Sequence, residues 1–306
     1  MPSILRALGA VALALGGQAV ALSAQSASTG IGEPRTLRVN GVERTYLLLV
    51  PSSYRPGTPA PLVLVFHGAG GRGRRMAPHT GFSRLAQREG FVAVYPDGLG
   101  RRWNDGRGTA AGQDDVGFVR ALLDTLRREL SLDSNRVYAT GISNGAMFSY
   151  RLACDLPGVL AAIAPVAGAT PATLTAGCAD TRPVSVLAIQ GTADPLLPYA
   201  GGGVAGGRGS VLPAAESIAF WARVSACTGP PAVTDEPDRV HDGTRVQRTA
   251  YAGCRDGRSV ELYTVRGGGH TWPGGPPVGR SVGRVSRELD ATAVIWQFFA
   301  RHSREP

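Results

Sequence analysis

The chain has 306 residues, 42 of them glycine and four of them cysteine, and a chain of this length can bury roughly three quarters of its unfolded surface. Its net charge of +9 comes wholly from arginine, since the sequence has no lysine. The loop arginines form neither a basic helix nor an array interleaved with aromatic residues, so no nucleic-acid partner is predicted. Attraction to anionic polymers is compatible with this charge.

The first residues have the pattern of a signal peptide over residues 1–24. Arg6 supplies the positive charge, residues 7–22 are apolar and small, and small residues follow, which predicts cleavage at about residues 21–27. Glycines and a glutamine interrupt the apolar run, so we expect no stable membrane insertion after cleavage. The mature protein is therefore expected to be secreted, either outside the cell or into a periplasm.

Residues 35–303 are expected to form a single domain, because neither an internal repeat nor a proline- or serine-rich linker divides them. Residues 36–39 and 44–50 predict a hairpin that turns at Asn40-Gly41. Further strands are predicted at residues 62–66, 91–95, 137–140, 161–166, 184–190, 246–251 and 260–265. Helices are predicted at residues 82–89, 115–130, 144–154, 214–225 and 287–302. This alternation predicts an α/β fold, with a mostly parallel twisted sheet, an antiparallel N-terminal hairpin and helices on both faces.

A Gly-x-Ser-x-Gly motif occupies residues 141–145, after a strand-like run and before a helix-like run. In that context the motif is typical of a nucleophile elbow, whose strained turn lifts the hydroxyl of Ser143 above an α/β-hydrolase sheet. A glycine-rich turn with an incidental serine is the alternative interpretation. As a nucleophile, Ser143 would require a histidine base, a carboxylate and amide donors for the oxyanion.

His270 is the predicted base, because it stands in a glycine-rich loop directly after the strand at residues 260–265. The chain order serine, acid, histidine of this fold excludes His67, which precedes the motif. His241 and His302 lie in polar or terminal sequence and are expected to be exposed. His79 is expected to cap a helix or to face solvent.

Asp194 is the predicted acid, because it follows the continuous apolar run at residues 184–190, the pattern of a strand buried on both faces. A turn-forming role before Pro195 is the alternative. The other aspartates in this part of the chain lie among turn residues without a preceding buried strand. They are Asp155, Asp180, Asp235, Asp238, Asp242 and Asp256.

The oxyanion hole is predicted to use the backbone amide of Asn144 and that of Gly68 or Ala69. Gly68 and Ala69 belong to the glycine-rich loop after the strand at residues 62–66. Small residues there allow the backbone to approach the substrate closely. The alternative interpretation is that those glycines only end the strand and begin a loop. Ligands bind beyond the carboxyl ends of the strands in such sheets, where all of these residues fall.

Four cysteines in an exported chain predict two disulfides, and the pairs Cys154-Cys178 and Cys227-Cys254 are favoured because each closes a modest loop. Cys-x-x-Cys, Cys/His clusters and His-Glu-x-x-His are all missing from the sequence, so neither a metal nor a cofactor is predicted.

His67, Trp103 and Trp272 are candidate substrate-binding residues, with core packing as the alternative for Trp272. Asp114 and Asp115 are expected to cap the helix that follows them, where acidic residues complement the helix dipole.

The motifs HGAGG, YPDG followed by Trp103-Asn104, DDVGF, GISNGA, GTADP and GGGHTWPG occur in this order. With them the chain, from about Arg35 to its end, resembles secreted α/β-hydrolases of the polyhydroxybutyrate depolymerase and feruloyl esterase type. The resemblance implies ester hydrolysis without a cofactor, with Ser143, Asp194 and His270 as the catalytic residues. Without a separate polymer-binding domain after the last helix, hydroxyalkanoate oligomers or acyl esters on polysaccharide are the expected substrates.

Two alternatives to a serine esterase remain open on the sequence. A peptidase of the same fold would use the same three residues, because acyl transfer from esters and from amides needs the same parts. A non-catalytic surface protein that binds polymer or carbohydrate is the alternative from another class.

Overall fold

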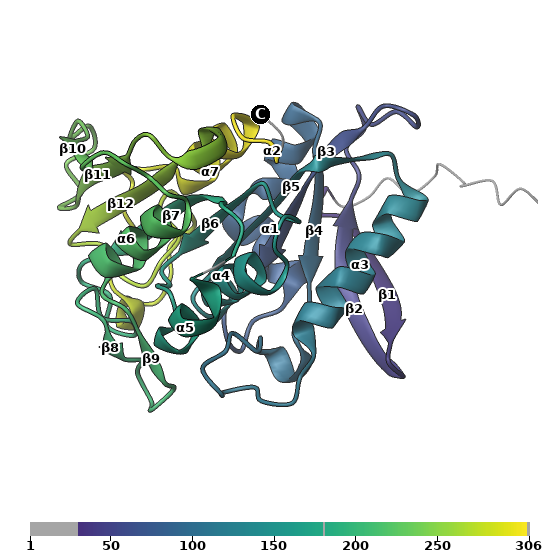
Figure 1. The fold of residues 1–306 in the computed structure, drawn as a ribbon, viewed down its shortest axis with the longest axis horizontal. Coiled ribbons are helices and arrows are strands. Elements are labelled where there is room, and N and C mark those ends of the chain that lie inside the picture. Colours follow the sequence, from purple (N-terminus) through teal and green to yellow (C-terminus); the bar gives the residue numbers. More distant parts are fainter. Residues whose placement is uncertain (1–29, 180, 305–306) are drawn as a thin grey trace, which may run out of the picture.

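The computed structural model describes residues 30–179 and 181–304, so the predicted signal peptide lies outside the described residues. One sheet of ten strands runs through the molecule in the order β1-β2-β4-β3-β5-β6-β7-β12-β11-β10 (Figure 1). Its centre is parallel from β4 to β12, as expected for an α/β fold. The parallel strands are β3 (Ala60–Phe66), β4 (Val92–Pro96), β5 (Leu132–Ile142), β6 (Ala162–Val166), β7 (Ser185–Gly191) and β12 (Val260–Arg266).

Antiparallel strands flank this centre on both sides. The predicted N-terminal hairpin is confirmed as β1 (Glu33–Val39) and β2 (Val42–Leu49), which turn at Asn40 and Gly41. On the other side β11 (Arg245–Tyr251) pairs with β12, and β10 (Ala232–Asp235) forms the edge. The strand β10 is not predicted by the sequence, because every one of its residues is exposed and no buried pattern marks it.

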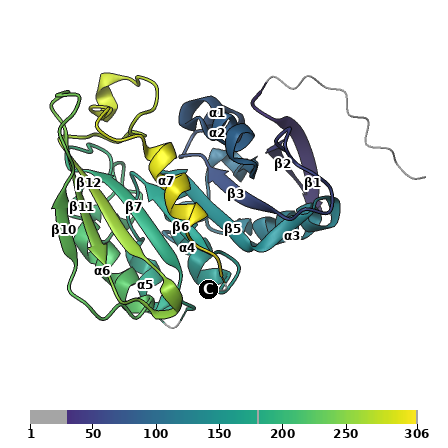
Figure 2. The same ribbon diagram turned by 90° about the horizontal axis from the view of Figure 1, so that it is seen from above.

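Helices cover both faces of the sheet (Figure 2). One face carries α3 (Asp115–Glu129), α4 (Asn144–Asp155), the short α5 (Thr175–Cys178) and α6 (Ala214–Val224). The other face carries α1 (Gly73–Thr80), α2 (Phe82–Glu89) and α7 (Ala291–Ala300). A second sheet of two short strands, β8 (Gly202–Gly203) and β9 (Ser210–Val211), lies outside the main one.

Side chains along the central strands point alternately to the two faces of the sheet, and each face has its own hydrophobic core. In β3, Leu62, Leu64 and Phe66 pack into the core beneath α3, α4 and α6, whereas Val63 and Val65 pack into the core beneath α1, α2 and α7. All five residues are fully buried, which explains why this strand is apolar at every position. The rigid centre of the sheet thereby fixes the loops that follow its strands.

Most predicted helices agree with the structure to within a residue or two, and the differences lie at α1, the short α5 and the final helix. The helix α1 is not predicted, because it contains Pro78 and because two of its four buried residues are Gly73 and Thr80. The final helix begins at Ala291 and not at residue 287, because Asp290 caps it by accepting a hydrogen bond from the Ala293 amide at 3.1 Å. Upstream, the Glu288 carboxylate accepts hydrogen bonds from the amides of residues 239–241.

Both predicted disulfides form. Cys154 of α4 is bonded to Cys178 of α5, and Cys227 after α6 is bonded to Cys254 after β11. They close loops with sequence separations of 24 and 27 residues. Each therefore ties a helix on one face of the sheet to a neighbouring connection.

Candidate active site

Ser143 occupies the tight turn between β5 and α4, with φ of 59° and ψ of −121°. A positive φ is unusual for a residue other than glycine, and such strain persists only where the surroundings enforce it. The surroundings here are close. A Cβ atom on Gly145 would lie 2.5 Å from the Phe66 carbonyl oxygen, and one on Gly141 would lie 2.6 Å from the same atom. The two motif glycines thus let α4 and β5 approach β3 and hold the serine in its turn.

Asp194 and His270 are joined by a hydrogen bond of 2.7 Å between Oδ2 and Nδ1. The other carboxylate oxygen, Oδ1, accepts the amides of Leu196 and Leu197, both at 2.8 Å. The Asp194 side chain is fully buried, and 10% of the His270 side chain is exposed. A carboxylate held in this way fixes the tautomer and orientation of the imidazole, and Nε2 is the ring nitrogen that Asp194 does not contact.

The loops that carry this pair are pressed together. A Cβ atom on Gly191, at the end of β7, would lie 2.4 Å from the carbonyl oxygen of Gly268, which follows β12. The His270 amide donates to the carbonyl of Val282 at 2.6 Å, which anchors the loop from its other side. A Cβ atom on Gly269 would lie 2.3 Å from the Val282 carbonyl oxygen, which explains the glycine directly before His270.

Ser143, Asp194 and His270 follow the carboxyl ends of β5, β7 and β12, so the structure places all three at one edge of the sheet. Between described residues, Ser143 Oγ and His270 Nε2 form no hydrogen bond. Catalytic hydrogen bonds are often long or poorly aligned without substrate and tighten in the complex.

The loop after β3 passes directly beside Ser143. A Cβ atom on Gly68 would lie 3.3 Å from that of Ser143, and Ala69 and Asn144 line the same small pocket as the serine. Within the described part of the chain, the backbone amides of Ala69 and Asn144 donate no hydrogen bond. Two free N–H groups beside a hydroxyl are the donors that a developing oxyanion needs.

The three residues predicted to contact substrate are buried, and the structure corrects that expectation. His67 is 1% exposed; its Nδ1 lies 2.8 Å from the Gly68 carbonyl oxygen, and its Nε2 accepts the Gly98 amide at 3.0 Å. Trp103 is fully buried, and its Nε1 donates to the His67 carbonyl at 3.0 Å. Trp272 packs in the core and donates to Thr292. These side chains support the loops of the site instead of lining a cleft.

The exposure of the remaining histidines agrees only in part with the prediction. His241 is exposed, as predicted, while His79 lies half-buried in the last turn of α1. His302 is buried, and the prediction of exposure is wrong. Its ring contacts the Phe298 carbonyl oxygen at 2.7 Å and Ser259 Oγ at 3.0 Å, so the residue fastens the end of α7 to the sheet. Burial lowers the pKa of both His79 and His302.

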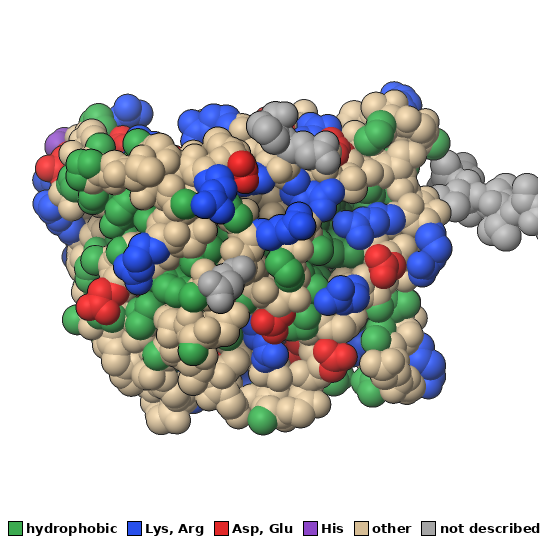
Figure 3. All heavy atoms as spheres, viewed as in Figure 1, with side chains coloured by type: hydrophobic (Ala, Val, Ile, Leu, Met, Phe, Trp, Pro, Cys, Tyr) green, Lys and Arg blue, Asp and Glu red, His purple; other side chains and the backbone are tan. Residues whose placement is uncertain are grey.

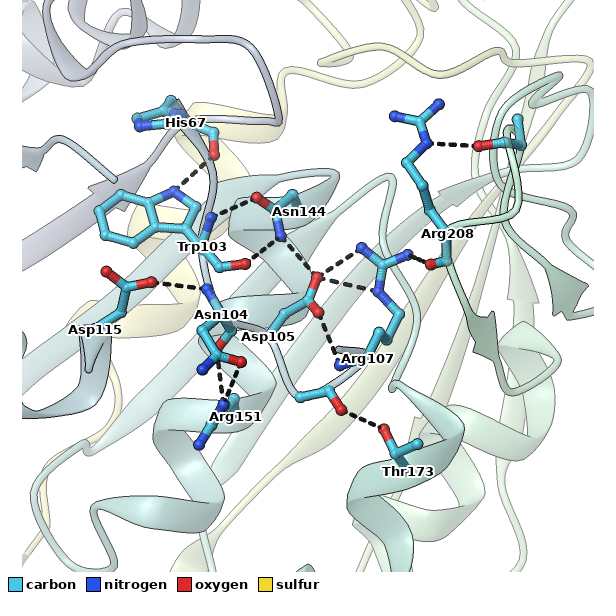
Figure 4. Close-up of polar contacts among 12 residues, drawn as sticks. His67, Trp103, Asn104, Asp105, Arg107, Asp115, Asn144, Arg151, Thr173 and Arg208 are labelled. Atoms are coloured by element: carbon cyan, nitrogen blue, oxygen red, sulfur yellow. Dashed lines mark hydrogen bonds and ion pairs between the residues drawn. The ribbon is translucent and has the colours of Figure 1, made fainter. Parts of the chain in front are cut away.

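A buried polar network connects the residue after Ser143 to its neighbours (Figure 4). The side chain of Asn144 pairs with the backbone of Trp103, accepting at 2.8 Å and donating at 3.0 Å, and it donates to Asp105 Oδ2 at 2.7 Å. Asp105 is fully buried and forms an ion pair of 2.6 Å with Arg107. Asp105 is a residue that sequence reasoning missed, since Trp103-Asn104-Asp105-Gly106 looks like an ordinary turn.

The two aspartates before α3 have different roles. Asp114 caps the helix, accepting the Gly117 amide at 2.8 Å, as expected. Asp115 is buried and forms an ion pair of 2.6 Å with Arg44 of β2, and it accepts the Asn104 amide at 2.7 Å. Its principal role is therefore to hold the turn beside the site, which corrects the expectation that it complements the helix dipole alone.

Over residues 30–179 and 181–304 no group of three or more His, Cys, Asp or Glu side chains could hold a metal ion. In the same part of the chain, each helix is too short or too polar to cross a membrane. Arginine side chains are spread over the face seen in Figure 3, with acidic side chains among them.

The chain is similar to known esterases in sequence and in fold. The model of the family described as Esterase PHB depolymerase matches residues 45–182. The chain is 34% identical over 284 residues to the putative esterase NocK of Nocardia uniformis, covering 86% of this chain and 81% of that protein. It is 29% identical to feruloyl esterase D of Neurospora crassa, covering 92% of each chain. The solved acetyl xylan esterase of Aspergillus awamori shares the fold, with a TM-score of 0.62 at 16% identity, over 88% of this chain and 99% of that one.

Proposed function

This chain belongs to the Esterase PHB depolymerase family and is a carboxylic ester hydrolase of the α/β-hydrolase fold, and we propose that it works through an acyl-enzyme formed on Ser143. The observation that carries the proposal is the buried Asp194–His270 hydrogen bond of 2.7 Å at the sheet edge where Ser143 occupies its strained turn. These are the parts that nucleophilic catalysis by a serine requires.

In the proposed mechanism, His270 Nε2 takes the proton of Ser143 as Oγ attacks the ester carbonyl carbon. Asp194 holds the imidazole through Nδ1 and stabilises the cation that forms. The carbonyl oxygen becomes an oxyanion, and the amides of Asn144 and Ala69 donate to it, with Gly68 allowing the close approach of that loop. Such a donor is typically worth about 2.7 to 4 kcal/mol of transition-state stabilisation.

The tetrahedral intermediate then collapses. His270 gives its proton to the departing alcohol oxygen, and the acyl group stays on Ser143. A water molecule, deprotonated by the same imidazole, attacks the acyl carbon, and the serine leaves with the proton restored. The overall reaction consumes only the ester and one water molecule, and no proposed step uses a metal or a cofactor.

The proposed substrates are hydroxyalkanoate oligomers or acyl esters on polysaccharide. Support comes from the relatives, which carry the names feruloyl esterase and acetyl xylan esterase, and from the family description. We also propose that the protein is exported. The signal-like residues 1–24 and two disulfides support this, because disulfides persist in oxidising compartments.

Labelling by a fluorophosphonate probe tests the mechanism. We expect the wild-type protein and a Ser53→Ala control, which alters an exposed serine, to be labelled and to hydrolyse p-nitrophenyl acetate. Ser143→Ala should lose both properties while keeping its fold. A folded wild-type protein that resists the probe would favour a non-catalytic binding protein, and peptide hydrolysis faster than ester hydrolysis would favour a peptidase.

A further inference from the structure

The pocket beside Ser143 is lined by positive side chains and by no acidic one. The space between its walls is about 20 Å³, close to the room that one water molecule needs, so it suits a small polar group. Its lining includes Arg102, Arg107 and Arg208 together with Ser143 and Asn144. Three arginines thus line the same pocket as the proposed nucleophile.

Arg107 is already neutralised. Its side chain is 4% exposed, pairs with the buried Asp105 at 2.6 Å and also donates to the backbone carbonyl of Arg208. It therefore serves to hold the wall of the pocket, and its charge is not available to a ligand.

The charges of Arg208 and Arg102 are not balanced by a carboxylate of the described residues. Among the described residues, neither forms an ion pair with a carboxylate. Arg102 is exposed, and Arg208 is half-buried with a hydrogen bond of 2.6 Å from Nε to the Ala205 carbonyl oxygen. That bond leaves both terminal nitrogens of Arg208 without a protein acceptor, and Figure 4 shows its guanidinium pointing away from Arg107.

The backbone around Arg208 is fixed before any ligand binds. Its carbonyl accepts from Arg107, and the amide of Ala205 donates to the Leu196 carbonyl in the loop of the predicted acid, at 3.0 Å. A planar guanidinium presented in a fixed position is suited to bidentate recognition of a carboxylate. The hydrogen bond from Arg208 Nε to the Ala205 carbonyl oxygen restrains the side chain, which lowers the entropy lost on binding.

We propose that Arg102 and Arg208 form an anion subsite that selects esters carrying a free carboxylate close to the scissile bond. The inference rests on the proposed function, because it needs Ser143 as the reacting group. The chemical class that fits is a short linear hydroxy-acid oligoester, whose alcohol portion ends in a carboxylate. Such an ester would place its carbonyl at Ser143 and its charge between the two guanidinium groups.

The test compares a linear 3-hydroxybutyrate dimer with its terminal carboxamide, which has the same shape without the charge. We expect the wild-type ratio of kcat/KM, acid over amide, to be about ten or more, because a hydrogen-bonded charge pair contributes of that order. Arg208→Gln and Arg102→Gln should each lower the ratio severalfold, chiefly through KM for the acid. Arg208→Lys should retain part of it, and added salt should reduce the wild-type ratio by screening.

Arg120→Gln is the matched control, since it removes one exposed arginine of α3 that is outside the pocket, and it should leave the ratio unchanged. A wild-type ratio near one, or an equal effect of Arg120→Gln, would overturn the anion subsite while leaving the esterase mechanism in place. A second measurement does not depend on turnover. 3-Hydroxybutyrate should slow fluorophosphonate labelling of the wild-type protein more than its amide does, and equal protection by the two would also overturn the subsite. Failure of labelling itself would instead contradict the proposed function.

Discussion

Asn144 Nδ2 donates to Asp105 Oδ2 at 2.7 Å, so a fully buried carboxylate is bonded directly to the residue that follows Ser143. The same carboxylate pairs with Arg107, whose guanidinium reaches the carbonyl of Arg208. One chain of contacts thus runs from the start of α4 to the loop that carries Arg208. The position of the Asn144 amide and that of the pocket wall depend on the same buried charge.

Asp105→Asn should destabilise the protein by about 3 to 5 kcal/mol, because it leaves the Arg107 guanidinium buried without its counter-charge. Urea denaturation measures the loss. The double variant Asp105→Asn with Arg107→Gln should recover much of it, since no charge then remains buried. Asp124→Asn is the control: its ion pair with Arg127 is exposed, and its loss should cost under about 1 kcal/mol. Equal effects of the two single substitutions would contradict the role of burial.

Asp194→Asn should lower kcat for p-nitrophenyl acetate by about 10⁴-fold with little change in fold. The amide would still accept from Leu196 and Leu197, yet it would present an N–H to His270 Nδ1 and favour the wrong tautomer. Asp235→Asn, which changes an exposed carboxylate at the sheet edge, is the control and should be neutral. If Asp194→Asn kept more than a tenth of the wild-type kcat, another group would have to orient the histidine.

The sequence predicts the strands that carry the site well, because each contains a run of buried residues that are mostly apolar or β-branched. Ser143, Asp194 and His270 each lie in a short motif directly after one of these strands. Because the strands are parallel, their carboxyl ends meet at one edge of the sheet. The burial of Trp103 could not be predicted in this way. An aromatic side chain in a polar turn has the same local signature whether it lines a cleft or packs beneath it.

The contacts of Asp105 and Arg208 could not be predicted from the sequence for a related reason. The ion pair of Asp105 with Arg107 is local, but Asp105 also accepts from Asn144, 39 residues away, and Arg208 contacts Arg107, 101 residues away. No local pattern indicates these two long-range contacts. His302 was likewise misjudged from its place near the end of the chain, because its contact with Ser259 depends on how α7 docks. Long-range polar contacts of this kind are specified by the tertiary fold.

Removal of either disulfide should lower stability by about 3 kcal/mol, the cost expected for opening a loop of the observed 24 or 27 residues. The variants are Cys154→Ala with Cys178→Ala, and Cys227→Ala with Cys254→Ala. Urea denaturation of each double variant, compared with the wild type under oxidising conditions, measures the effect. Addition of dithiothreitol should destabilise the wild type and leave a variant without any cysteine unchanged. A wild type that is insensitive to the reductant would contradict the contribution of both bonds.

Stability should fall as the pH decreases from about 7 to 5, partly because of His302. Burial is the main cause that lowers the pKa of this imidazole, with Arg301 adding to it. The folded pKa thus lies below the unfolded value of about 6.5, so the unfolded chain binds the proton first as the pH falls. The stabilisation is complete above the unfolded pKa and is lost on descending through it toward the folded pKa, at no more than about 1.4 kcal/mol per pH unit.

Urea midpoints between pH 5 and pH 8 measure this dependence, and His302→Gln should flatten it. The variant cannot be protonated, so its stability should change less between pH 7 and pH 5 than that of the wild type, even if its stability at pH 8 is lower. The residual slope should reflect His67 and His79, whose pKa values burial also lowers. A variant that kept the full wild-type slope would show that the imidazole of His302 is not held neutral by its buried position beneath the end of α7.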